Sequence, residues 1–177
     1  TIGDSVVLDR GGVRVGILGL TNPNIPHWDP ASHWAGLTFG DPVATARTAV
    51  ESLRRRADVI VVVIHAGFER DLETWRPNSS DSENFASRVA ELPGIDLLLT
   101  GHTHRNIAPR RLGSTIVAQP GRWAELVARI DLSLRKEDGR WRVVDWRGAN
   151  LPTQGEAADE RIVKAVEPLR ARVEAEL

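Results

Sequence analysis

Three of the five histidines follow short runs of aliphatic residues. His65 comes directly after Val59–Ile64, and His102 and His104 lie in Gly101–His104, just after Ile95–Thr100. Neutral imidazole is the commonest metal ligand in proteins. Side chains two residues apart in an extended loop point the same way, so His102 and His104 can face one site. We therefore predict that His65, His102 and His104 converge on a metal; the alternative is surface or hydrogen-bonded core histidines.

The two aliphatic runs are predicted to be buried strands of one sheet. Val59–Ile64 is β-branched throughout, as is typical of a strand covered on both faces. The spacing between His65 and His102 suits one strand–helix–strand unit. Ser80-x-x-Glu83 is a capping box, so we predict the connecting helix at Ser80–Leu92. If the strands are parallel, the histidine loops share the sheet edge at which ligands bind in open α/β folds.

The remaining elements extend this sheet. Asp41-Pro42 is typical of a helix start, and Asp138-Gly139 of a hairpin turn. The other elements that we predict are a hairpin over Val6–Leu20, short strands at Ile107–Arg111 and Thr115–Ala118, an antiparallel pair from Leu126 to Asp145, and a helix over Glu156–Leu177. This order predicts an α/β fold with a mixed sheet and room for a second sheet stacked on it.

Composition excludes several classes of protein. The 177 residues carry a formal net charge of −1, which argues against a nucleic-acid polymer held on a basic surface. No apolar run approaches the ~20 residues that span a bilayer. Cysteine is absent, which removes disulfides, thiolate nucleophiles and cysteine-ligated zinc.

Other polar residues carry weaker signals. His27 and His33 lie in a loop rich in Trp, Pro and Asn, and we expect them to face solvent; the alternative is a loop that faces substrate. Asp71 and Glu73 are expected to be solvated. Positive charge at Arg54–Arg56 suits the end of a helix. The segment Gln119–Arg122 follows a short strand and is a candidate to face the site.

The two histidine motifs also carry a family resemblance. Val61–Gly67 and Gly101–His104 resemble the last two motifs of the calcineurin-like metallophosphoesterases. Nearly the whole chain is similar to the branch of 5'-nucleotidases and 2',3'-cyclic-nucleotide 2'-phosphodiesterases. The matching stretches are Gly16–Thr21, Ile25–Trp28, Ser82–Asn84, Leu92–Asp96 and Gln119–Arg122.

The resemblance implies a four-layered αββα sandwich that holds two divalent metal ions at strand ends. By resemblance, His65 and His102 would bind one metal and His104 the other, and Zn, Mn, Fe, Co and Ni all suit such ligands. The implied reaction is hydrolysis of a nucleotide or another phosphoester by a displacement at phosphorus. A periplasmic or extracellular location is likewise implied only by resemblance.

The chain departs from the family pattern at its start. The earlier family motifs Asp-x-His, Gly-Asp and Gly-Asn-His-Asp/Glu are absent, and Gly3-Asp4 lacks the buried strand that should precede it. We therefore expect residues 1–152 to correspond to the C-terminal half of a catalytic domain, with the N-terminal half as partner. Residues 153–177 would be a helical connector toward a further C-terminal domain. Catalytic and substrate-binding residues stay unassigned, and we expect no activity from this chain alone.

Two other interpretations compete with an enzyme part. The chain could be a non-catalytic metallophosphoesterase-like module, or a half-domain that needs a second chain. Thr100-Gly101-His102 matches a nucleotidyltransferase signature, but that motif should follow the first strand of its domain. Here it follows a late strand, which disfavours nucleotidyl transfer.

Overall fold

The computed structural model describes residues 5–78 and 83–176, which form two β-sheets and four α-helices. The strands are β1 (Ser5–Arg10), β2 (Val13–Leu20), β3 (Val59–Ile64), β4 (Leu97–Leu99), β5 (Asn106–Leu112), β6 (Thr115–Pro120), β7 (Leu126–Glu137) and β8 (Arg140–Pro152). The helices are α1 (Ile25–Trp28), α2 (Pro42–Arg54), α3 (Ala86–Ala90) and α4 (Glu160–Glu176), with a 3-10 turn at Ala31–His33. The predicted α/β class is confirmed.

The larger sheet has six strands in the order β1-β2-β3-β4-β6-β5. Its four inner strands run parallel, and β1 and β5 pair antiparallel at the two edges. The predicted parallel pairing of the strands before His65 and His102 is confirmed by the register Val61↔Leu97. The carboxyl ends of β3 and β4 therefore lie at the same edge of the sheet.

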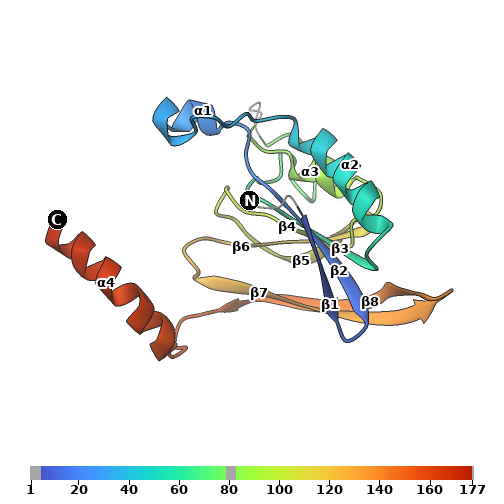
Figure 1. The fold of residues 1–177 in the computed structure, drawn as a ribbon. Helices are drawn as coiled ribbons and strands as arrows, with labels where there is room; N and C mark the ends of the chain where they lie inside the picture. The colour runs from blue at the N-terminus through green and yellow to red at the C-terminus, as the bar shows by residue number, and fades with distance from the viewer. Residues whose placement is uncertain (1–4, 79–82, 177) are drawn as a thin grey trace.

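Helices and the second sheet cover opposite faces of this sheet (Figure 1). Asp41 begins α2 as predicted, since its carboxylate accepts the backbone N–H groups of Val43 and Ala44. The α2 side chains Val50 and Leu53 are buried in the core. The β7–β8 hairpin lies against the other face, so the described residues supply three of the four expected layers, and α4 projects away from them.

The predicted Asp-Gly turn is confirmed. Asp138 and Gly139 both have positive φ angles, 49° and 79°, as a two-residue hairpin turn requires. The turn lets β7 and β8 pair along nearly their whole length, from Leu126↔Pro152 to Glu137↔Arg140.

The predicted start of the connecting helix is wrong. Ser80 lies outside the described residues, and α3 is confined to Ala86–Ala90. Glu83 and Asn84 are not helical, since tertiary hydrogen bonds hold them: Asn22 Nδ2 donates to the Glu83 carbonyl, and Asn84 Oδ1 accepts the Gly67 N–H. These longer-range contacts hold Glu83 and Asn84 outside the helix, which in the described residues begins at Ala86.

Apolar side chains stay exposed outside the core. Val63 is 41% exposed on β3, and Val127 and Leu151, which face each other across the β7–β8 pair, are 53% and 43% exposed. The α4 helix carries five further exposed apolar residues and buries none. No helix in the described part of the chain is both long and apolar enough to cross a membrane.

Candidate metal centre

Two of the three predicted histidines meet at the sheet edge. His65 directly follows β3, and His102 follows β4 after Thr100 and Gly101. The centroids of their imidazole rings are 5.2 Å apart, with the ring planes inclined at 67°. The prediction that both loops open on one edge is confirmed, and the physical cause is the parallel pairing of β3 with β4.

His104 makes a different ring contact. The centroids of its ring and that of Trp123 are 6.3 Å apart, and within the described ranges no ring contact joins it to His65 or His102. The expectation of an extended loop is wrong, because His102 and His104 have left-handed backbone conformations with φ angles of 69° and 56°. Such left-handed conformations cost non-glycine residues about 1–3 kcal/mol each. In residues 5–78 and 83–176, no three His, Cys, Asp or Glu side chains form a group that could hold a metal ion.

Side-chain hydrogen bonds fix this loop. Thr103, between the two histidines, exchanges hydrogen bonds with the buried amide of Gln119, which also accepts the Thr100 hydroxyl. Thr103 in turn packs against Gly67, where a Cβ would collide with the threonine side chain and lie 2.9 Å from Asn84 Oδ1. The candidate segment at Gln119 thus supports the histidine loop from inside the core.

Asn22 links the loop after β3 to the segment before α3. It is fully buried, and its Nδ2 donates to the backbone carbonyls of His65 and Glu83, at 3.3 and 2.8 Å. One amide therefore links the chain after β2, the loop after β3 and the segment before α3.

Glu83 brings a carboxylate to the histidines. Its Oε2 lies 3.3 Å from His102 Nε2, and its Oε1 accepts the indole N–H of Trp28 at 3.2 Å. The Trp28 ring stacks on His102, with centroids 5.2 Å apart and planes inclined at 20°. The capping-box pattern predicts a different role for Glu83, and its contact with His102 and Trp28 is signalled in the sequence by the family-like stretches Ser82–Asn84 and Ile25–Trp28.

The surroundings of His65 favour the neutral form of its ring. Partial burial lowers the pKa of His65, and the nearby His102 and His104 lower it further. His65 is therefore unprotonated at neutral pH, which is the form that binds a metal. The neutral ring of His65 and the adjacent ring of His102 offer nitrogen ligands of the kind that divalent cations bind.

The other candidate residues lie away from this cluster. His27 and His33 are exposed, as expected; it is Trp28 of their loop that reaches His102. Arg54 is structural, since its guanidinium donates to the carbonyls of Gly94 and Asp58. The Arg122 guanidinium lies 4.0 Å from the centre of the Trp123 ring. Asp71 and Glu73, in the loop after β3, are partly and fully exposed.

Known proteins with related sequences are nucleotide phosphoesterases. A 2',3'-cyclic-nucleotide 2'-phosphodiesterase/3'-nucleotidase of Salmonella typhimurium is 28% identical over 91% of this chain. The trifunctional nucleotide phosphoesterase protein YfkN of Bacillus subtilis is 28% identical over 84% of it. The chain spans only 27% and 11% of the lengths of these relatives. No family model matches the chain.

Solved structures agree with these relatives. A Staphylococcus aureus protein described as a 5'-nucleotidase superposes with a TM-score of 0.77 and 31% identity, over 97% of this chain and 34% of its own. The calcineurin-like phosphoesterase YfkN of Bacillus subtilis superposes with a TM-score of 0.74 and 26% identity, over 95% of this chain and 57% of its own. Sequence and fold together show that this chain belongs to the calcineurin-like phosphoesterases, among the relatives of 5'-nucleotidases and 2',3'-cyclic-nucleotide 2'-phosphodiesterases.

Proposed function

We propose that this chain supplies part of a divalent-metal centre for hydrolysis of nucleotide phosphoesters, within a larger enzyme. His65 and His102 would hold one metal ion, and His104 would serve a second, as the family resemblance implies. The observation that carries the proposal is the 5.2 Å separation of the His65 and His102 ring centroids at the ends of two parallel strands. The Glu83 carboxylate contacts the His102 ring.

Glu83 and Trp28 would orient His102. A carboxylate can only accept, so the contact between Glu83 Oε2 and His102 Nε2 would favour the tautomer that carries its proton on Nε2. This leaves the lone pair of Nδ1 free to bind a metal. Carboxylates that fix the tautomer of a liganding histidine are a common feature of metal sites. Stacking of Trp28 on the His102 ring limits its rotation.

A divalent metal at this position would supply positive charge that stabilises phosphoryl oxygens and lowers the pKa of an attacking water. The chain's own residues would hold the ligands in place: Asn22 and Gln119 fix the two loops, and His65 stays neutral because of its depressed pKa. Zn, Mn, Fe, Co and Ni all suit imidazole ligands.

The centre would be completed by residues beyond these 177. Two neighbouring dications repel strongly unless anionic ligands lie between them. Among the described residues, Glu83 is the carboxylate that contacts this histidine pair, and it is already bonded to His102 and Trp28. The chain's 27% share of its relative's length supports a larger enzyme. Residues 1–152 would belong to its catalytic domain, and α4 to a connector.

Metal binding and activity test the proposal separately. Titration calorimetry of the chain with Zn and Ni should show one weak site, which His102→Ala removes. With Mn or Zn, the chain should not hydrolyse 4-nitrophenyl phosphate, its bis ester or 2',3'-cyclic AMP. Turnover should appear when the N-terminal half of the parent protein is added. Robust turnover by the chain alone would contradict an incomplete centre.

A non-catalytic module is the second candidate. It is favoured by the lack, in the described ranges, of any three-ligand group. A module of this kind predicts no metal binding by the chain and no turnover after the N-terminal half is added, so the same two measurements separate it from the enzyme part.

A further inference from the structure

The turn between β6 and β7, residues 121–125, lies against the second histidine of the loop after β4. The centroids of the His104 and Trp123 rings are 6.3 Å apart, and their planes are inclined at 56°. Both residues line a pocket of about 810 Å³, and Thr153, the first residue after β8, lines it as well. This pocket therefore brings a candidate metal ligand together with the first residue of the predicted connector.

The 121–125 turn has a strained backbone. Trp123 and Ala124 are consecutive residues with left-handed φ angles of 54° and 56°. Side chains other than glycine disfavour this conformation, so it persists only where neighbouring contacts hold it. Trp123 is 74% exposed, so burial of the indole ring does not hold the turn. Hydrogen bonds from the surrounding chain are therefore needed to keep this shape.

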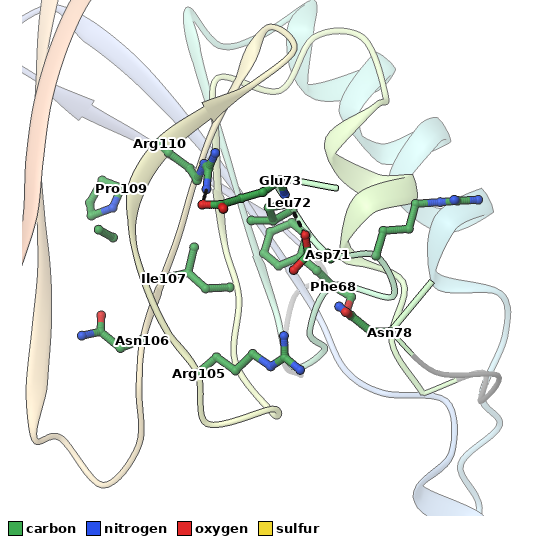
Figure 2. A pocket seen from close by; sticks show the side chains of 12 residues that line it. Phe68, Asp71, Leu72, Glu73, Asn78, Arg105, Asn106, Ile107, Pro109 and Arg110 are labelled. Carbon is green, nitrogen blue, oxygen red and sulfur yellow. Dashed lines mark hydrogen bonds and ion pairs between the residues drawn. The ribbon is translucent and has the colours of Figure 1, made fainter. Parts of the chain in front are cut away.

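One backbone hydrogen bond ties the 121–125 turn to the histidine loop. The Gly121 N–H donates to the carbonyl of Arg105, the residue after His104, at 3.1 Å. The Arg105 side chain takes no part in this contact, because it lies on the wall of another pocket and extends toward Asn78 (Figure 2). The first residue of the turn is thus joined to the histidine loop through main-chain atoms.

Thr153 holds the other end of the 121–125 turn. Its hydroxyl donates to the Ala124 carbonyl at 2.6 Å, and its N–H donates to the Glu125 carbonyl at 3.0 Å. The hydroxyl also lies 3.2 Å from the Glu125 carbonyl. A hydroxyl has one proton to donate, so the shorter contact, to Ala124, is the stronger of the two. The Thr153 side chain thus acts directly on one of the two left-handed residues.

We propose that Thr153 is a positioning residue for His104 and acts through the 121–125 turn. The proposal rests on the proposed function, in which His104 serves a second metal ion. Without the Thr153 hydroxyl, the Ala124 carbonyl loses its partner, and the backbone at Trp123 and Ala124 relaxes toward right-handed conformations. Trp123 then leaves the His104 ring, which loses a neighbour that limits its position. The predicted connector thus begins with a residue that sets the geometry of a metal ligand.

NMR of the chain in EDTA tests the position of His104 without a metal or a substrate. The ring current of Trp123 shifts the His104 Hε1 resonance, so Trp123→Leu should move it. Thr153→Val keeps the shape of the side chain but removes the hydroxyl, and should move the resonance in the same direction. Thr153→Ser keeps the hydroxyl and should leave the resonance at its native position. Thr48→Val is the matched control, since the Thr48 hydroxyl donates to the Ala44 carbonyl within α2.

A double variant shows whether Thr153 acts through Trp123. Thr153→Val combined with Trp123→Leu should give the His104 resonance of Trp123→Leu alone, because both changes remove the same neighbour. A native resonance in Thr153→Val would overturn the role of Thr153, and a native resonance in Trp123→Leu would overturn the ring contact. The His65 resonance reports whether each variant is folded. If Thr153→Val does not fold, the comparison of Thr153→Ala with Thr153→Ser replaces it.

Turnover separates this inference from the proposed function. In the enzyme assembled with the N-terminal half, Thr153→Val should lower kcat about 10- to 100-fold, as for other groups behind a metal ligand, and Thr153→Ser should restore it. Zinc binding by the chain alone should not change, since the proposed site of His65 and His102 does not include the turn. Native turnover in Thr153→Val would overturn the role of Thr153 in the reaction. Absence of turnover in the native assembly would count against the proposed function, whereas the NMR comparison in EDTA would still decide what positions His104.

Discussion

At the residue scale, the contact between Glu83 and His102 is the first feature to test at the proposed metal centre. Glu83→Gln keeps the shape of the side chain but turns a carboxylate into an amide, which no longer fixes the His102 tautomer. We expect affinity for Zn to fall about 10- to 100-fold, as for other groups behind a metal ligand. Calorimetric titration measures this. Glu91→Gln, on the exposed residue after α3, is the control; an equal loss there would contradict a specific role for Glu83.

His102 itself should matter for metal binding and little for stability. Its side chain is partly exposed and belongs to a loop, so His102→Ala removes few core contacts. We expect the thermal midpoint to change by no more than about 2 °C, while zinc binding is lost. Differential scanning calorimetry with and without Zn tests both. In the larger enzyme proposed above, the same change should abolish phosphoester hydrolysis; full activity with normal metal content would refute the assignment.

At the scale of elements, Gly67 decides how closely the two histidine loops approach. A Cβ at this position would collide with Thr103 and crowd Asn84. We expect Gly67→Ala to destabilise the fold by about 1–3 kcal/mol and to weaken metal binding, because the loop after β4 must shift. Gly19→Ala is the matched control, since its Cβ would meet no atom within 4 Å. Urea unfolding of both variants gives the comparison, and equal stabilities would show that the loops can separate freely.

The opposite end of the sheet depends on an ion pair between β2 and the start of β3. The side-chain hydrogen bond from Arg14 lowers the pKa of Asp58, which outweighs the effect of its burial. The stabilisation is therefore present above the unfolded pKa of ~3.9 and is lost as the pH falls through the lower folded value.

Asp58→Asn should lower the thermal midpoint at pH 7 by about 2–5 °C. The difference between Asp58→Asn and the native protein should shrink as the pH falls from ~4 through the lower folded pKa of Asp58, where the native carboxylate becomes protonated. Thermal unfolding of both proteins between pH 7 and pH 2.5 measures this difference. A difference in thermal midpoint that is constant with pH would mean that ionisation of Asp58 does not contribute to the stability of the fold.

At the scale of the molecule, exposed apolar surface predicts self-association. Val127 and Leu151 share the outer side of the β7–β8 hairpin, and both are more than two-fifths exposed. Exposed apolar side chains that lie side by side lose contact with water when a second copy covers them. Sedimentation velocity should show a mass that rises with concentration, and the double change Val127→Lys and Leu151→Lys should shift it toward the monomer. Arg142→Lys, on the same hairpin, should have no effect; a monomer at all concentrations would contradict the prediction.

The sequence alone determined several secondary-structure elements, including the strand that precedes His65. Val59–Ile64 is β-branched throughout, Asp41 accepts the first N–H groups of α2, and Asp138-Gly139 suits only a tight turn. These are local properties, since backbone sterics and short-range hydrogen bonds decide them within a few residues. Parallel pairing of β3 and β4, and with it the shared edge of His65 and His102, followed from the strand–helix–strand order.

Only the tertiary structure decided what surrounds those histidines. Trp28 and Glu83 are 55 residues apart in sequence, and Asn22 and Glu83 are 61 apart, yet each pair is joined by a hydrogen bond. Thr103, between the left-handed residues His102 and His104, donates a hydrogen bond to Gln119, 16 residues further along the chain. Hydrophobic periodicity and helix-capping patterns cannot predict such contacts, because they arise only when distant loops pack together and satisfy one another's polar groups.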